Sequence, residues 1–253
     1  MDIKRILVIF IIAFLLFSGK IFAVDVDQGN ISQYKEIENY LNKILDFHEE
    51  TLKKIIANLP KDKRDWYAPL YEDYQVIVES CDEPFAFVDL ATKSSQKYIH
   101  ISKGYLWARI MLRERIINWE LKSEAELAGI LAHELGHLVL VQGRKIIISD
   151  EEYVKQEVTV DAFAASLLLK ERYQPLVVVN TLEKYLENCY DYFEHFVSKY
   201  VFQKRIQLVK KMVLEAMAKF PSNEYKKFII ATQEEFEKIK ELIRAENTSL
   251  FTP

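Results

Sequence analysis

Between residues 31 and 102, hydrophobic residues recur first with a helical period and then in short runs typical of β-strands. Over residues 31–59 apolar side chains fall three or four positions apart, which is typical of one face of an α-helix, and Pro60 ends the pattern. A polar, turn-rich connection is expected over residues 62–71. Three short runs rich in Val, Ile, Phe and Tyr follow and predict strands over residues 74–79, 85–90 and 97–102.

After Gly104 the pattern becomes helical and stays so. The order of a long leading helix, a small sheet and a helical body predicts an α+β fold. The helices are expected over residues 105–118, 123–141, 150–170, 176–187, 196–219 and 223–245.

The first 23 residues have the layout of a secretory signal peptide. Lys4 and Arg5 precede an unbroken apolar run over residues 6–17, and Ile21-Phe22-Ala23 offers a small residue at a cleavage site. We therefore expect residues 1–23 to be removed and residues 24–253 to form a single domain in the periplasm or outside the cell. The alternative is an uncleaved N-terminal anchor, through which alone we expect any membrane association.

Composition narrows the class of partner. Loss of residues 1–23 would remove one acidic residue, Asp2, and three basic ones, which moves the formal net charge from −4 to −6. An acidic chain whose basic residues are scattered does not predict nucleic-acid binding. Half of the residues are hydrophobic and only six are glycine, which indicates a compact, helix-rich domain.

Two cysteines, Cys81 and Cys189, leave two interpretations open. An exported protein permits a disulfide, and buried thiols are equally ordinary core residues. The sequence does not give the Cα separation that would decide between them.

The predicted helix over residues 123–141 contains the motif His133-Glu134-Leu135-Gly136-His137. Histidines at positions i and i+4 lie one turn apart on the same helix face, so both imidazoles can bind one zinc ion. Glu134 follows the first histidine directly and is placed to act as general base toward a metal-activated water.

The next predicted helix offers a third ligand, which a catalytic zinc site requires beside an open position. Glu157 lies 20 residues past His137, a distance that a helix–turn–helix hairpin can close. Asp161, one turn further along the same face, is a natural acceptor for the N–H of a liganding histidine. Glu151 and Glu152 are the alternative ligands, although acids in a first helical turn commonly serve the helix dipole. We expect one zinc ion per chain.

The stretch SEAELAGILAHELGHLVLVQGR, residues 123–144, resembles the active-site helix of HtpX- and BepA-like gluzincin peptidases, which include the CAAX prenyl endopeptidases. In that family a Glu-x-x-x-Asp unit on the next helix supplies the third ligand, and here the unit runs from Glu157 to Asp161. The resemblance covers residues 84–170. It implies a zincin-like fold, with a catalytic core over about residues 72–170 and a helical C-terminal part over about residues 171–253.

The sequence departs from the family pattern in three places. Phe85 stands where the family has Asn, and Val160 stands where it has Ala before the aspartate. The downstream Thr-His-Pro element is missing. His195 is the nearest counterpart of its histidine, and the resemblance implies for it a role in stabilising the transition state. The alternatives for that role are Tyr190, Tyr192 and Arg205.

Together these features predict a zinc metalloendopeptidase that hydrolyses exported or unfolded proteins. A protein or peptide substrate is expected to add as a strand along residues 85–90 or 97–102. A catalytically latent, zinc-holding module with a chaperone-like function is the alternative, and a structural zinc site lacks an evident fourth ligand. His48 and His100 are interpreted as structural residues.

Overall fold

The computed structural model describes residues 31–67, 74–80, 86–88, 97–102, 124–140, 149–188, 197–219, 238–239 and 241–242. The chain divides into two compact units, residues 1–34 and 35–253. The predicted signal peptide, the predicted helix over residues 105–118 and most of that over residues 223–245 lie outside the described residues. Cys81, Cys189 and His195 also lie outside the described residues. The predicted domain organisation, a signal peptide followed by one domain, stays a prediction.

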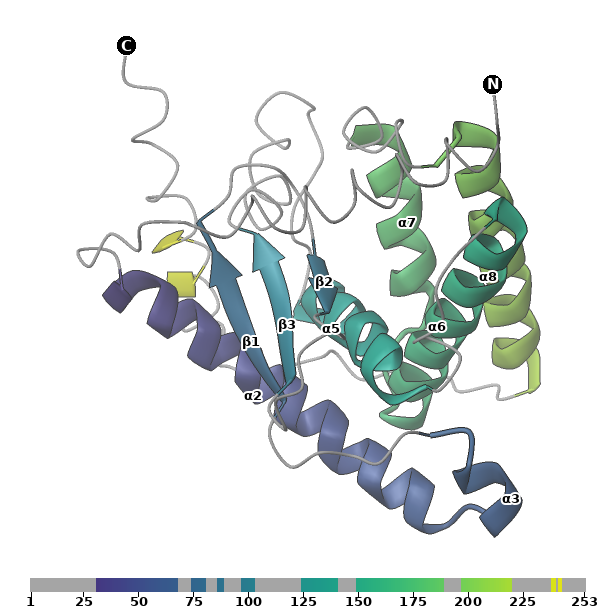
Figure 1. Ribbon diagram of the computed structural model, residues 1–253, viewed down its shortest axis with the longest axis horizontal. Helices are drawn as coiled ribbons and strands as arrows, with labels where there is room; N and C mark the ends of the chain where they lie inside the picture. The colour runs from purple at the N-terminus through teal and green to yellow at the C-terminus, as the bar shows by residue number, and fades with distance from the viewer. Residues whose placement is uncertain are drawn as a thin grey trace, which may run out of the picture. The chain divides into compact units, whose positions relative to one another are not determined.

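A leading helix, a small mixed sheet and a group of packed helices make up the fold (Figure 1), which confirms the predicted α+β class. Both six-residue strands and the helix over residues 150–170 have the predicted bounds, and the other predicted elements differ by a few residues at their ends. The elements are α2 (Ile31–Ala57), α3 (Lys61–Arg64), β1 (Tyr74–Glu79), β2 (Ala86–Val88), β3 (Lys97–Ser102), α5 (Glu124–Val139), α6 (Asp150–Lys170), α7 (Leu176–Asn188) and α8 (Lys199–Lys219).

The three strands have the order β1-β3-β2. β3 pairs in parallel with β1, with Val76 opposite Ile99, and antiparallel with β2, with Phe87 opposite His100. Because β3 has a partner on each side, the expectation that residues 97–102 present an exposed edge to a substrate is wrong. β2, within the other candidate segment, lies at an edge of the three described strands.

Helix α2 covers the outer edge of β1. The side chain of Asn42 accepts a hydrogen bond from the backbone N–H of Val76 at 2.8 Å, and Glu38 accepts one from that of Val78 at 3.2 Å. These two N–H groups would otherwise be unpaired at a sheet edge. The apolar face of the same helix enters the core through Ile37, Leu41, Ile44, Leu45 and Leu52.

His48 joins α2 to the helical part of the fold. Its side chain is fully buried, with Nδ1 2.9 Å from a carboxylate oxygen of Glu171 and Nε2 3.0 Å from the carbonyl oxygen of Ala128 in α5. A buried imidazole with a partner at each ring nitrogen avoids the cost of an unpaired polar group. This arrangement agrees with the structural role expected for His48.

The segment after α2 forms a short helix, α3, where the sequence predicted only a connection. The carbonyl of Pro60 accepts hydrogen bonds from the backbone N–H groups of Lys63 and Arg64, which closes one helical turn. Proline is well suited to a helix start because it has no N–H to satisfy there. None of the helices in the described part of the chain combines the length and apolar composition needed to cross a bilayer.

Helix α6 ends in a turn that requires an unusual backbone conformation. Arg172 has φ 67°, in the left-handed region. The N–H of Tyr173 donates to the carbonyl of Leu168 at 2.8 Å and that of Arg172 to Leu169 at 3.0 Å, which is the hydrogen-bond pattern of a Schellman motif. Glycine usually fills this position because a Cβ atom is strained there.

Replacing Arg172 by glycine should therefore stabilise the protein. We expect Arg172→Gly to raise the free energy of unfolding by about 0.5–1 kcal/mol, since the left-handed conformation costs a non-glycine residue roughly 1–2 kcal/mol and glycine loses part of the gain in the unfolded chain. Urea unfolding measures the change. Lys155→Gly, at an exposed interior position of α6, is the matched control and should cost about 1 kcal/mol. Equal destabilisation by both substitutions would contradict the assignment of strain to Arg172.

Candidate metal centre

Helices α5 and α6 approach each other closely at Gly136. A Cβ atom at that position would lie 2.8 Å from Cγ1 of Val160 and 2.9 Å from Cδ1 of Phe163, both closer than real Cβ atoms come. Any side chain at this position would force Val160 or Phe163 of α6 to shift, so glycine suits the close packing of the two helices. Its helical neighbours His133 and His137 are consequently brought against the face of α6.

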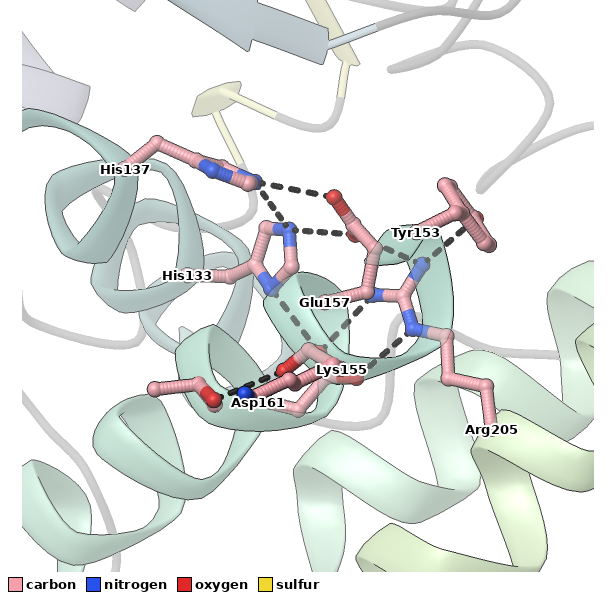
Figure 2. Close-up of polar contacts among 8 residues, drawn as sticks. His133, His137, Tyr153, Lys155, Glu157, Asp161 and Arg205 are labelled. Atoms are coloured by element: carbon pink, nitrogen blue, oxygen red, sulfur yellow. Dashed lines mark hydrogen bonds and ion pairs between the residues drawn. The ribbon is translucent and has the colours of Figure 1, made fainter. Parts of the chain in front are cut away.

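The histidine pair on α5 and Glu157 on α6 converge on one point (Figure 2). The Nε2 atoms of His133 and His137 lie 3.1 Å apart. One oxygen of Glu157 lies 3.5 Å from Nε2 of His133, and the other lies 3.4 Å from Nε2 of His137. These three residues form a group that could hold a metal ion.

The spacing of these atoms fits a zinc ion. Bonds of 2.0–2.2 Å in a tetrahedral arrangement separate neighbouring ligand atoms by about 3.3 Å. The 3.1 Å between the two imidazole nitrogens is close to that value. Each nitrogen also has a different oxygen of Glu157 at 3.4 or 3.5 Å, and one ligand atom from each residue lies within 4.8 Å of the others. Two imidazoles and a carboxylate are also a ligand set found in catalytic zinc sites, which keep a further position open.

Asp161 determines which nitrogen of His133 faces the centre. Its carboxylate is 2.8 Å from Nδ1 of His133 and almost fully buried. Because a carboxylate accepts, Nδ1 carries the hydrogen, and a neutral imidazole then has its lone pair on Nε2. The pairing therefore orients His133 as a metal ligand requires. The contact with His133 is of the kind expected from the sequence for Asp161, whose part in metal binding stays a prediction.

Arg205, on α8, contacts Glu157 and Asp161, the two acidic residues of α6 that face the centre. Its Nε and Nη2 donate to the two oxygens of Asp161 at 2.7 and 2.9 Å, and its Nη1 lies 2.8 Å from Glu157. The planar guanidinium matches a carboxylate with two parallel hydrogen bonds, so it restrains the carboxylate of Asp161 in direction as well as position. α8 thereby becomes part of the centre.

From the sequence, Arg205 was proposed only as an alternative to His195. The contact between Arg205 and Asp161 was not predicted. A signal was present, because Arg205 lies in α8 next to Ile206 and one turn from Phe202 and Val209, on the apolar side of the helix. A charge at such a position needs a buried partner.

Tyr153 is a further residue that the sequence did not identify. It lies one turn before Glu157 on the same face of α6, and its hydroxyl oxygen accepts from Nη1 of Arg205 at 3.1 Å. Burial raises the pKa of Tyr153, and Arg205 lowers it by less. The neutral hydroxyl thus gives the guanidinium a third partner (Figure 2).

The charges of the centre shift several pKa values. Burial opposes the charged form of Asp161, but Arg205 and His133 outweigh it, and its pKa lies well below the ordinary range. Burial also lowers the pKa of His133, which Asp161, Glu134 and Glu157 together raise above its ordinary value. If the carboxyl groups of Glu134, Glu157 and Asp161 are all ionised and both imidazoles are neutral, these three charges and that of Arg205 sum to −2, which a divalent cation would balance.

Glu134 lies beside the histidine pair in the buried part of α5. Only 6% of the residue is exposed. Burial raises its pKa, while the charges of His133 and His137 act in the opposite direction. Burial therefore makes the carboxylate of Glu134 take up a proton more readily than an exposed glutamate does.

The other residues considered from the sequence lie elsewhere. Glu151 and Glu152 are exposed in the first turn of α6, where the N–H of Glu152 donates to the capping hydroxyl of Ser149 at 3.2 Å. His100 pairs with Glu79 at 2.7 Å and stacks on Phe87. His195 and its alternatives Tyr190 and Tyr192 lie outside the described residues.

No protein-family model and no curated protein matches this sequence. The class of site therefore rests on its geometry: a His-Glu-x-x-His helix and a glutamate from the next helix form a potential metal-binding group.

The contact at Gly136 predicts a difference between the two glycines of α5. Gly136→Ala should destabilise the protein by about 1–3 kcal/mol and weaken zinc binding, because Val160 and Phe163 must shift and disturb the packing of α6, which carries Glu157. Gly129→Ala is the matched control, since its Cβ would lie 3.4 Å from Val177, an ordinary contact, and alanine favours helix by up to about 1 kcal/mol. Zinc titration and urea unfolding measure both effects. Unchanged zinc affinity in Gly136→Ala would show that the close approach is not needed.

The contacts of Arg205 predict a second effect. Arg205→Gln should lower the free energy of unfolding by about 3–5 kcal/mol, because Asp161 would stay buried without its main partner. Zinc affinity should fall by roughly 10–100-fold as His133 loses its fixed orientation. Lys210→Gln, on the same helix as Arg205, is the control. It removes a surface ion pair with Glu183 of α7 and should change the free energy of unfolding by less than about 1 kcal/mol. Similar losses from both substitutions would argue against a special role for Arg205.

Proposed function

We propose that this protein is a zinc-dependent endopeptidase that hydrolyses peptide bonds of exported or unfolded proteins. The observation that carries the proposal is the convergence of His133, His137 and Glu157 beside the buried Glu134. The resemblance of residues 123–144 to the active-site helix of gluzincin peptidases supports a peptidase rather than a structural metal site. A structural site is usually closed by a fourth protein ligand, and the group within the described residues has three.

In peptide hydrolysis each residue of the centre would have a separate role. His133, His137 and Glu157 would hold the zinc, which when bound supplies a Lewis acid that polarises the scissile carbonyl and activates water. Glu134 would take up the proton of the attacking water and return it to the leaving amine. Asp161 and Arg205 would keep His133 and Glu157 in position and would not contact the reacting atoms.

We place the substrate along β2, at the edge of the described sheet. β2 lies at an edge of the described strands and contacts α5, so an extended peptide could pair with its backbone near the centre. Backbone pairing requires an extended chain, which unfolded proteins offer. The proposal also includes export, because the layout of residues 1–23 is that of a signal peptide.

Replacement of the proposed base tests the function. Glu134→Gln in the full chain should lower cleavage of unfolded casein at least about 10³-fold while zinc remains bound, because the amide cannot accept the proton. A zinc chelator should abolish cleavage by the unmodified chain, and added zinc should restore it.

The control is Glu126→Gln, on the same buried helix. Glu126 pairs with Lys184 of α7 at 2.6 Å, so its loss affects packing and leaves the proposed chemistry intact. Cleavage per zinc-loaded molecule should stay within about threefold of the unmodified chain. Wild-type activity in Glu134→Gln would exclude Glu134 as the base, and zinc binding without any cleavage would favour the latent, zinc-holding module.

A further inference from the structure

The outer face of α8 carries most of the large apolar side chains that the described residues expose. Tyr200 is 73% exposed, Leu214 48%, Met212 44% and Leu208 39%, and outside α8 only Trp66 belongs to the same set. Single exposed apolar residues are normal on a protein surface, whereas their concentration on one element indicates a contact surface.

The same helix concentrates positive charge. Its sequence contains five lysines, one inward-facing arginine and a single acidic residue, Glu215, in a chain whose formal net charge is −4. Lys210 pairs with Glu183 at the surface. The remaining lysines are Lys199, Lys204, Lys211 and Lys219, all exposed.

Apolar and cationic side chains share one strip of the helix. At 3.6 residues per turn, Tyr200, Lys204, Leu208 and Lys211 fall within an arc of about 80°, and the one carboxylate of the helix, that of Glu215, lies in the same arc. Leu214 lies next to that arc. Lysine stems can lie along apolar surroundings while their ammonium groups extend outward. The ammonium groups of this strip can therefore reach farther from the helix axis than the leucine and tyrosine side chains beside them.

We propose that this outer face of α8 docks on an anionic lipid surface. At such a surface apolar side chains enter the boundary between headgroups and acyl chains, and lysines meet lipid phosphates. A protein partner is less well matched, because the centres of protein–protein interfaces are depleted in lysine, which here alternates with the apolar residues. The inner face of the same helix carries Arg205, so the docked element is one that builds the metal centre.

Vesicle flotation of the full chain tests the docking. The measured quantity is the ratio of partition into phosphatidylcholine vesicles with and without phosphatidylglycerol, because the apolar run over residues 6–17 can bind either kind. Lys204→Gln with Lys211→Gln should lower that ratio about thirtyfold, since each lysine near an anionic surface contributes about 1 kcal/mol. Leu208→Ser with Leu214→Ser should lower binding to the anionic vesicles severalfold.

The matched control is Lys35→Gln with Lys54→Gln, which removes two lysines of α2 that are 63% and 71% exposed. It should leave the ratio within about twofold of the unmodified chain. Equal losses in both lysine pairs would overturn the proposal, since the effect would then follow total charge. A loss that follows Lys204 and Lys211 but not the leucines would also overturn it, because the face would then bind polyanions in general.

Discussion

The buried carboxylate of Asp161 is the interaction on which the candidate centre depends. An isolated buried charge is unstable, so Asp161 requires partners, and it has them on two other helices. Arg205 of α8 gives it two hydrogen bonds, and His133 of α5 gives it a third. The carboxylate thus connects α5, α6 and α8 through a network whose parts do not tolerate separate removal. The orientation of the first histidine follows from the same contacts.

Packing and electrostatics agree at this place. Gly136 permits α6 to lie against α5, and Val160, larger than the alanine that the family resemblance led us to expect, fills the space beside it. The approach brings several carboxylates together, which a single guanidinium does not balance. A group of ligand atoms with an excess of negative charge is favourable for a divalent cation and unfavourable without one.

Local signals in the sequence predicted much of the fold and the centre of the site. Strand bounds at residues 74–79 and 97–102 followed from β-branched and aromatic runs, and α6 from its serine cap and its periodicity. The helical spacing of His133 and His137 requires no tertiary information. The order of the strands does require tertiary information, because strand pairing joins segments far apart in the sequence. The central position of β3 was therefore not predicted.

Arg205 was missed for a related reason. Its partners lie 44 and 48 positions earlier in the chain, so no local pattern connects them. A buried charge on an apolar helix face indicates that a partner exists without telling which one. The short helix α3 was missed because a single turn initiated by Pro60 looks in sequence like any polar turn.

X-ray absorption at the zinc edge of the zinc-loaded chain tests most directly whether His133, His137 and Glu157 hold a metal ion. The account predicts one zinc per chain, with only nitrogen and oxygen ligands at about 2.0–2.2 Å and two imidazoles among them. Replacement of Glu157 by alanine should remove one light-atom ligand and leave both imidazoles. Sulfur ligands at about 2.3 Å, or a chain that retains no stoichiometric zinc, would contradict the account.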